Sequence, residues 1–390
     1  MKKILIVAYY FPPFGGVGAV RMTKLVKYFS RFGWDVTVAT VNEKYYDQSQ
    51  LDYDKENEIP SQVKVIRTKR YSQFTSFKEE GLYWAVDLYR NIKKLIKNEK
   101  FDYIFYTGGP FFHWVVAPII KKYSKIPYVL DFRDPWLLTP YNNSKIRKVI
   151  SGILEPYVIK NADVIINVTE DATNMYKNHY KSIEENKFIT ISNGYDPEDF
   201  TDINDMELNL PGRKIVYTGK FGGFRKPLKF LAALDKYNQK NEEKMYFIHV
   251  GQQEEEIKNY LESNPAIRPY VVQTGFVPYK KALEYVKASD ITLIISGGHP
   301  YEPTTKIYDY IALKKPIFCI NDINYGYLFE TLNSYSLSVH CKNEESEILN
   351  GLNHIMLNTV INEDECDDSE FNRESLFKNL NNYLENKLSI

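Results

Sequence analysis

The first forty residues alternate between a continuous apolar run and a helical stripe. Residues 4–8 (Ile-Leu-Ile-Val-Ala) are all apolar, which predicts a strand buried on both faces of a parallel sheet. After a loop with two prolines and two glycines, apolar residues recur at the spacing of one helix face as far as Gly33, a residue type that often ends helices. Residues 35–40 read as a second strand. Residues 3–41 therefore predict a strand–helix–strand unit.

The same alternation continues along the chain. Strands are predicted near 63–68, 102–107, 127–132, 163–168 and 188–192, with helices near 82–97, 112–123 and 145–161. A second series of strands, near 214–219, 245–250, 270–274, 291–296, 316–320 and 336–339, also alternates with helices. Residues 193–212 are rich in Asp, Asn, Gly and Pro and predict a linker. The predicted fold class is α/β, with two doubly wound parallel-sheet domains of about 1–200 and 201–370 that face each other across a cleft.

Composition narrows the class of protein. A chain of 390 residues with 44% hydrophobic and 26% charged residues is neither disordered nor collagen-like. No stretch approaches the roughly 18 apolar residues of a spanning helix, and the apolar run after Met1 is too short for a signal peptide. Three cysteines without metal-ligand spacing suggest a reducing compartment. We therefore expect a cytoplasmic protein, free in solution or peripheral on the inner face of the membrane.

The charges are unevenly divided. Basic and acidic residues number 50 each, but residues 1–150 hold 25 Lys/Arg against 14 Asp/Glu, a balance of +11, which leaves −11 for the remainder. The zero net charge argues against a nucleic-acid coat, so no nucleic-acid partner is expected. The basic first half is expected to meet an anionic partner.

Two glycine-containing loops follow predicted first strands. Gly15 and Gly16 precede the first helix, where a ligand phosphate could approach the backbone; alternatively, they form a plain tight turn. The dinucleotide fingerprint is broken because Arg21 replaces its third glycine. In the second series, residues 220–226 hold three cations around two glycines, which suits a diphosphate, or else form a solvated basic loop.

A third motif, residues 301–310, follows the strand at 291–296 and opens a helix. Thr304 and Thr305 can cap this helix, and Lys306 with its free N–H groups can hold phosphate oxygens. Asp309, one turn further on, can accept hydrogen bonds from two ribose hydroxyls. A helix that is merely capped would need the threonines alone.

Taken together, these segments resemble family-4 nucleotide-sugar glycosyltransferases of the GT-B fold. The resemblance is carried by six segments in the family's order, at residues 10–16 (YFPPFGG), 132–136 (FRDPW), 192–196 (SNGYD), 217–225 (YTGKFGGFR), 275–277 (GFV) and 306–316 (KIYDYIALKKP). It implies two Rossmann-like domains, the acceptor on the first and the nucleotide-sugar on the second. It also implies a final helix, near 371–390, that crosses back to the first domain.

The resemblance implies a retaining, metal-independent transfer without a cofactor, from a donor that is UDP-linked by family frequency. By position, Arg225 and Lys226 match the cations that neutralise the leaving diphosphate, with Lys220 as a third candidate. Val277 matches a backbone contact to the base, and Gly16 approaches the donor phosphate across the cleft. Residues 304–306 match the phosphate loop, and Asp309 matches the ribose-binding acid.

The motif departs from the family pattern at its first acid. The usual Glu-x7-Glu has Asp309 in the second position, but the first is Tyr301, with Glu302 displaced by one residue. Either Glu302 or another group therefore takes the place of this acid at the transferred sugar. The only Asp-x-Asp sequence, at 52–54, lies in a polar loop, and no metal site is expected there.

Candidates for the acceptor side end two strands of the first series. His113 stands where the family places a histidine facing the reacting sugar, although a lone histidine is more often structural. Asp131, Arg133 and Asp134 follow the next strand. They either bind acceptor hydroxyls or pair with each other as a loop clasp.

The basic first half suggests a lipid partner. The helix at 82–97 mixes aromatic and cationic residues, which suits an interface with anionic lipid; alternatively, its aromatics pack on the sheet and its cations are solvated. We expect an acceptor that is a glycan or a polyprenyl-diphosphate-linked sugar. The leading function is a hexosyltransferase of bacterial surface polysaccharide, such as capsule or O-antigen. The alternatives are a nucleotide-sugar epimerase of the same fold and a non-catalytic subunit bound at a membrane surface.

Overall fold

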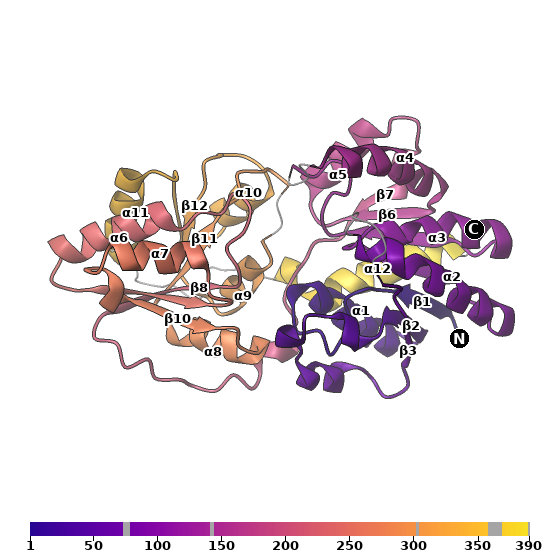
Figure 1. Cartoon of the computed structure of the whole chain (residues 1–390), viewed down its shortest axis with the longest axis horizontal. Helices are drawn as coiled ribbons and strands as arrows, with labels where there is room; N and C mark the ends of the chain where they lie inside the picture. The colour runs from indigo at the N-terminus through magenta and orange to yellow at the C-terminus, as the bar shows by residue number, and fades with distance from the viewer. Residues whose placement is uncertain (73–78, 141–143, 302–303, 358–368, 389–390) are drawn as a thin grey trace. The chain divides into compact units, whose positions relative to one another are not determined.

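The computed structural model describes residues 1–72, 79–140, 144–301, 304–357 and 369–388. The chain separates into two compact units, which we call the N-terminal unit (Met1–Asn193 with Arg373–Ile390) and the C-terminal unit (Gly194–Asn372). Each contains one parallel sheet with helices on both faces (Figure 1). The predicted fold class, two Rossmann-like α/β domains, is confirmed.

The N-terminal sheet has seven strands in the order β3-β2-β1-β4-β5-β6-β7. Their bounds are β1 Lys3–Val7, β2 Asp35–Val41, β3 Lys64–Thr68, β4 Tyr103–Thr107, β5 Tyr128–Phe132, β6 Val164–Asn167 and β7 Phe188–Thr190. All pairs are parallel, and Ile4 of β1 faces Val36 of β2 on one side and Tyr103 of β4 on the other. The order turns back between β1 and β4, which is the switch point of a doubly wound sheet.

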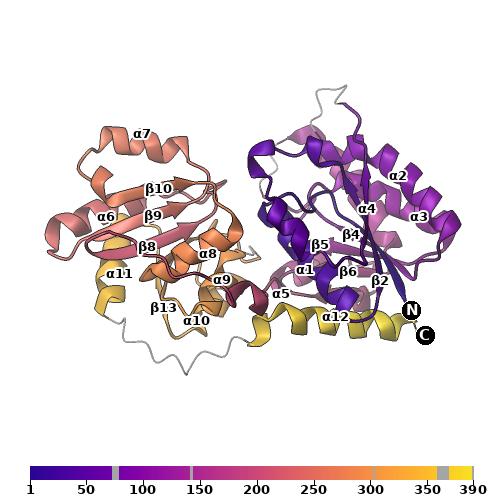
Figure 2. The same ribbon diagram turned by 90° about the horizontal axis from the view of Figure 1, so that it is seen from below.

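Helices cover both faces of this sheet (Figure 2). Their bounds are α1 Val17–Arg31, α2 Glu80–Asn98, α3 Val116–Ser124, α4 Lys145–Asn161, α5 Glu170–His179 and α12 Arg373–Leu388. Alternate residues of β1 point to opposite faces. Leu5 and Val7 join the cluster packed by α2, α3, α4 and α5, whereas Ile4 and Ile6 join the cluster packed by α1 and α12. The unbroken apolar run is therefore explained by burial on both sides.

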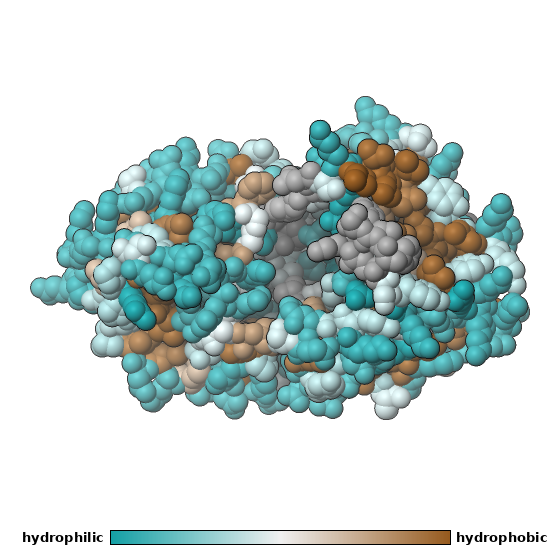
Figure 3. Space-filling model, viewed as in Figure 1, coloured by the Kyte–Doolittle hydropathy of each residue, from teal (hydrophilic) through white to brown (hydrophobic). Residues whose placement is uncertain are grey.

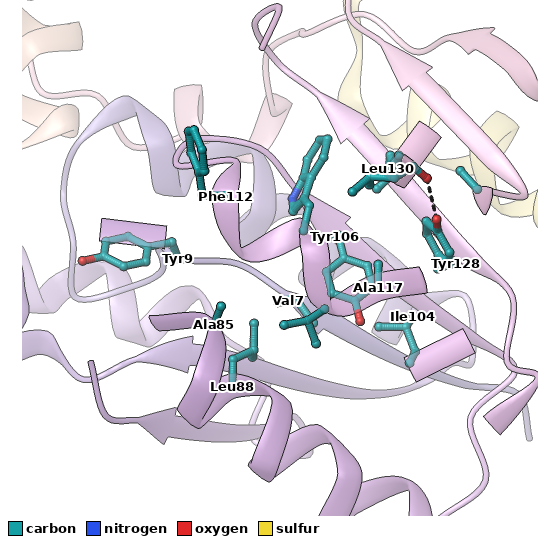
Figure 4. Close-up of a cluster of buried hydrophobic side chains, with 14 of the residues drawn as sticks. Val7, Tyr9, Ala85, Leu88, Ile104, Tyr106, Phe112, Ala117, Tyr128 and Leu130 are labelled. Atoms are coloured by element: carbon teal, nitrogen blue, oxygen red, sulfur yellow. Dashed lines mark hydrogen bonds between the residues drawn. The ribbon is translucent and has the colours of Figure 1, made fainter. Parts of the chain in front are cut away.

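The first of these clusters combines aromatic and aliphatic residues. Figure 4 shows Val7 of β1 close to Ala85 and Leu88 of α2, and Ile104 of β4 close to Ala117 of α3. The hydroxyl of a buried tyrosine, Tyr128, donates to the Val158 carbonyl of α4 at 2.5 Å. A buried hydroxyl needs such a partner, and this bond holds α4 on the sheet.

The last helix, α12, belongs to the N-terminal unit. Phe377 packs against Tyr28 of α1, with ring centroids 6.2 Å apart, and the Trp34 indole donates to Asn381 at 2.6 Å. The C-terminal segment thus completes a face that residues 1–193 alone would leave uncovered.

The C-terminal sheet has six parallel strands in the order β10-β9-β8-β11-β12-β13, with its switch point between β8 and β11. The strand bounds are β8 Arg213–Thr218, β9 Met245–Val250, β10 Val271–Gly275, β11 Ile291–Ile295, β12 Ile317–Ile320 and β13 Ser338–Cys341. The helix bounds are α6 Leu228–Lys240, α7 Glu255–Ser263, α8 Tyr279–Ala288, α9 Lys306–Ala312, α10 Tyr327–Asn333 and α11 Glu345–Leu357. One face packs on α6, α7 and α11, and the other on α8, α9 and α10.

Candidate functional site

Open α/β sheets bind ligands beyond the carboxyl ends of their strands, at the switch point. In the C-terminal unit this point lies between β8 and β11. The β8 loop carries the predicted cations, and the chain after β11 leads into α9, which begins at Lys306. The fold therefore brings two separately predicted motifs to one edge of one sheet.

Three glycines line this edge because backbones approach closely there. Gly219, with φ +93°, follows β8, and its N–H donates to the Val250 carbonyl at 2.7 Å. A Cβ at Gly251 would lie 2.4 Å from the Gly219 carbonyl oxygen, so only glycine fits. Gly251 in turn pairs with Gly275, which has φ +77°. The ends of β8, β9 and β10 thus present bare backbone.

Lys306 extends from α9 to this backbone. Its ammonium lies 3.9 Å from the centre of the Tyr217 ring and 3.9 Å from the position a Gly219 Cβ would take. Tyr217 is fully buried in β8 and stacks on Phe221, with centroids 3.9 Å apart. A cation over an aromatic face is stabilised by about 0.5–2 kcal/mol. The ammonium is therefore held at the carboxyl end of β8.

His249 of β9 completes this group. It is buried, and its Nε2 donates to the Gly219 carbonyl at 2.9 Å. Burial lowers the pKa of His249, the hydrogen bond to Gly219 opposes this shift, and the charge of Lys306 adds to it. The imidazole is therefore neutral at pH 7, and it orients the loop that begins at Gly219.

Asp309 lies one turn into α9, half-buried, and accepts a hydrogen bond from the Tyr279 hydroxyl of α8 at 2.6 Å. The next residue, Tyr310, hydrogen-bonds through its hydroxyl to the Thr218 backbone N–H at 3.1 Å. These bonds fix α9 relative to β8 and α8. The expected cap from Thr305 is wrong, because Thr305 is the N-cap residue of α9 and its side chain makes no capping bond.

The three predicted loop cations differ in their surroundings. Lys220 is exposed. Arg225 is half-buried, and its backbone N–H donates to the Gly222 carbonyl at 3.2 Å. Lys226 pairs with Glu256 of α7 at 3.0 Å, and both side chains are exposed. Such a surface pair contributes at most about 1 kcal/mol, so it does not prevent Lys226 from turning to a ligand.

Three other predicted donor residues lie near the same edge or outside the described residues. Val277, just after β10, is half-buried and packs against the apolar cluster beneath α8, α9 and α10. Its contact to a nucleotide base stays a prediction. Thr304 is buried beside α9. Glu302 lies outside the described residues.

In the N-terminal unit the glycine loop packs on residues 50–52. The Gly15 N–H donates to the Gln50 carbonyl at 2.8 Å, and a Cβ at Gly15 would lie 2.8 Å from that of Asp52. Gly15 is therefore required by local packing, and its N–H is already engaged. Gly16 is the N-cap of α1, so the predicted phosphate approach rests on Gly16 and the first turn of that helix.

A buried ion pair joins α1 to β5. The Arg21 guanidinium lies 3.0 Å from the Asp131 carboxylate, and the two side chains are 4% and 0% exposed. Asp131 also accepts from the Thr107 hydroxyl at 2.9 Å, and Arg21 donates to the Ser192 carbonyl at 2.9 Å. The geometry therefore favours a structural role for Asp131 over contact with acceptor hydroxyls. Asp131 does form an ion pair, but its partner is Arg21 and not the predicted Arg133.

Arg133 instead joins two loops of the N-terminal switch point. Its guanidinium donates to the Gly18 carbonyl in α1 and to the Gly108 carbonyl after β4. It is half-buried, whereas Asp134 beside it is exposed. Asp134 is thus the member of this predicted trio whose side chain is most open to a ligand.

His113 lies in the short helical segment Phe112–Val115 after β4 and is fully buried. Its ring is 4.8 Å from that of Trp84. Among the described residues no hydrogen bond of ordinary geometry reaches either ring nitrogen. Burial lowers the pKa of His113 to about 3, with the Pro110 carbonyl opposing the shift. The imidazole is therefore neutral, and its role toward a sugar remains a prediction.

Sequence reasoning missed several residues that shape these edges, namely Arg21 as an ion-pair partner, Tyr217, His249 and Tyr279. Arg21 was visible only as the residue that breaks the dinucleotide fingerprint. Among the described residues there is no cluster of three or more His, Cys, Asp or Glu side chains placed to hold a metal ion. No helix in the described ranges is long and apolar enough to cross a bilayer.

Comparison with known proteins addresses the family. Residues 14–199 match the model of Glycosyltransferase Family 4. These residues, just under half of the chain, are similar to a family-4 domain, and the chain is a glycosyltransferase. No curated protein matches the chain.

Solved structures share the whole fold of this glycosyltransferase at low identity. Sucrose-phosphate synthase from Thermosynechococcus elongatus is 13% identical with a TM-score of 0.77, covering 100% of both chains. HepE from Anabaena, solved with UDP and glucose, is 14% identical with a TM-score of 0.67, covering 99% of this chain and 100% of its own. UDP-GlcNAc 2-epimerase from Methanocaldococcus jannaschii is 14% identical with a TM-score of 0.66, covering 98% and 99%. The fold is thus shared by a sucrose-phosphate synthase and an epimerase, and the enzyme class of this chain rests on the family match over residues 14–199.

Proposed function

We propose that this glycosyltransferase moves a sugar from a UDP-linked donor to a glycan or polyprenyl-diphosphate-linked acceptor, with retention of configuration and without a metal. Its place would be the synthesis of a bacterial surface polysaccharide at the cytoplasmic face of the membrane. Nucleotide-sugar transfer is the activity of the family; the donor, the stereochemistry and the acceptor are our proposal.

The observation that carries the donor assignment is the ammonium of Lys306 held over Tyr217 beside Gly219. A positive charge next to bare backbone at a switch point is suited to a diphosphate. HepE, which shares the fold, binds UDP, and this supports a uridine donor. Asp309, oriented by Tyr279, would accept from the ribose hydroxyls.

The chemistry requires few protein groups. The bond between the anomeric carbon and the diphosphate oxygen breaks, and a bond to the acceptor oxygen forms on the same face of the sugar. The leaving phosphate takes the acceptor proton, so no protein nucleophile is needed. Negative charge grows on the diphosphate, where Arg225, Lys226 and Lys306 would stabilise it more strongly in the transition state than in the ground state. Lys220 would add a further charge.

The N-terminal unit would supply the acceptor side. The exposed carboxylate of Asp134 would accept from an acceptor hydroxyl, and Arg133 would hold the surrounding loops in place. His113, neutral because burial lowers its pKa, would donate to or accept from a sugar hydroxyl without adding charge. Gly16 would approach the donor phosphate through the first turn of α1.

The test is the double variant Arg225→Ala with Lys226→Ala, assayed for release of UDP from a UDP-sugar panel in the presence of EDTA. Transfer should fall roughly 100-fold or more, because each stabilising donor of this kind contributes a factor of about 100–1000. The matched control, Lys240→Ala with Lys258→Ala, removes two exposed cations from the same unit and should keep full activity.

Full activity of the Arg225/Lys226 variant, with its thermal unfolding unchanged, would refute the mechanism. A wild-type protein that converts the donor sugar to its epimer without releasing UDP would favour the epimerase alternative. Loss of activity on removing metal would contradict the metal-independent part of the proposal.

A further inference from the structure

Helix α4 carries an apolar row on its solvent side. Four residues at helical spacing are strongly exposed, Ile146 (66%), Val149 (64%), Ile153 (68%) and Tyr157 (48%). The opposite side is buried against the N-terminal unit, through Ser151, Glu155, Val158 and Ile159. The row extends over three helical turns, about 16 Å.

A surface helix normally turns polar residues to water, and an apolar row on the outer side marks a face that something covers. Figure 3 shows hydrophobic residues gathered on the surface over α4. The row continues toward the neighbouring α3, where Ile119 is 47% and Tyr123 is 55% exposed. We call the exposed apolar residues of α3 and α4 the α4 surface.

The exposed charges that α3 and α4 themselves carry are positive. Lys145, Lys148 and Lys160 of α4 and Lys122 of α3 are exposed cations, while the one acidic residue of the two helices, Glu155, is buried. From neighbouring α2, the Lys93 ammonium lies 5.2 Å from the centre of the Tyr123 ring. The α4 surface therefore presents apolar side chains flanked by positive charge.

The aromatic residues Tyr83 and Trp84 of the predicted lipid-facing helix at 82–97 do not belong to the α4 surface. This helix corresponds to α2, where Tyr83 and Trp84 are buried at 5% and 0% exposure. The alternative interpretation, aromatics packed on the sheet, is therefore the one realised for these two residues. The apolar contribution comes from α4 and α3 instead.

We propose that the α4 surface docks this protein on an anionic phospholipid bilayer, with the apolar row in the acyl boundary and the lysines at the headgroups. Apolar side chains flanked by lysine are what such a boundary accommodates. A second copy of the chain is a poor occupant, because a two-fold contact would place the same lysines against each other. The bilayer satisfies both features at once.

Docking would also place the loop that contains Arg133 and Asp134 near the lipid. The significance of this placement rests on the proposed lipid-linked acceptor. On the buried side of α4, Glu155 accepts from the Leu137 N–H at 2.6 Å. Leu137 follows directly on the segment that contains Arg133 and Asp134. The helix that meets the bilayer is thus bonded to the loop that would meet the acceptor.

The test is co-sedimentation of the full chain with vesicles of phosphatidylcholine plus phosphatidylglycerol, and with vesicles of phosphatidylcholine alone. We expect binding to the anionic vesicles at low salt that weakens steeply at high salt. Val149→Asn with Ile153→Asn should reduce vesicle affinity at least about tenfold, since each methylene group withdrawn from the acyl region weakens binding about fourfold. Tyr325→Asn, which alters a 58% exposed tyrosine in the other unit, should bind like wild type.

Charge is tested separately. Lys148→Glu with Lys160→Glu should abolish the preference for anionic vesicles, whereas Lys240→Glu with Lys258→Glu should keep it. Thermal stabilisation by UDP, measured on every variant, should not change, so a failed docking proposal and a failed donor proposal give different results. Absence of wild-type binding at low salt, or wild-type affinity in the Val149/Ile153 variant, would overturn docking. A dimer that dissociates in the Val149/Ile153 variant would also overturn it, by naming a second copy as the occupant.

Discussion

The buried pair of Arg21 and Asp131 allows a stability prediction to be worked out from geometry. Arg21 donates to Asp131 at 3.0 Å and to the carbonyls of Ile191 and Ser192 at 3.0 and 2.9 Å. Arg21→Met removes the charge and all of these bonds while keeping most of the volume. It leaves the Asp131 carboxylate buried without its ion-pair partner, which costs about 3–5 kcal/mol. That is a large fraction of the roughly 5–15 kcal/mol that stabilises a domain.

The four tryptophans of the chain, at positions 34, 84, 114 and 136, all lie in the N-terminal unit. Urea unfolding followed by tryptophan emission therefore reports on the unit that contains the pair. Lys64→Met is the matched control, because Lys64 pairs with Glu99 at 2.7 Å in a solvent-accessible pair, with Lys64 exposed and Glu99 half-buried. That pair should contribute no more than about 1 kcal/mol.

Coupling between the two residues tests the reasoning further. The double variant Arg21→Met with Asp131→Asn should be more stable than the sum of the single effects predicts, by about 1–3 kcal/mol, because the second change removes the stranded charge. If Arg21→Met shifts the unfolding free energy no more than Lys64→Met does, the pair is not acting as a buried ion pair and the argument fails.

Two further predictions concern other buried positions. Burial raises the pKa of Glu155 to about 7 from its ordinary 4.5, with hydrogen bonds from Tyr180 and the Leu137 N–H opposing the shift. Between pH 4.5 and 7 the folded unit therefore holds Glu155 protonated, whereas the unfolded chain has lost this proton. The stabilisation from Glu155 is fully present below about pH 4.5 and is lost as the pH rises through 7. The total change in the free energy of unfolding is about 3 kcal/mol. Urea unfolding across this range should show a smaller pH dependence in Glu155→Gln, and identical slopes would contradict the assignment. Gly251→Ala should destabilise the C-terminal unit by about 1–3 kcal/mol through the clash with the Gly219 carbonyl, seen as faster hydrogen exchange in β8 and β9. Gly222→Ala, which meets nothing within 4 Å, should leave exchange unchanged, and equal effects of the two changes would refute the packing argument.

Much of the fold follows from patterns that are local in the sequence. The apolar run at residues 4–8 predicts β1, and the run at 291–296 predicts β11, because a strand covered on both faces tolerates few polar residues. The motif at 301–310 was placed correctly at the opening of α9. The threonine cap was not, because capping depends on the backbone angles of one residue, which the residue types do not fix.

The sequence by itself determined the order of strands and helices, the α/β class and the segments that resemble family-4 transferases, because these depend on periodicity and on short runs of residues. The tertiary structure decided which residues meet. Arg21 pairs with Asp131, and Lys306 lies over Tyr217, only after the sheets assemble and bring distant segments together. It also decided which side of α4 stays open, because a helix with apolar residues on both faces carries no local signal of the face that its neighbours will cover.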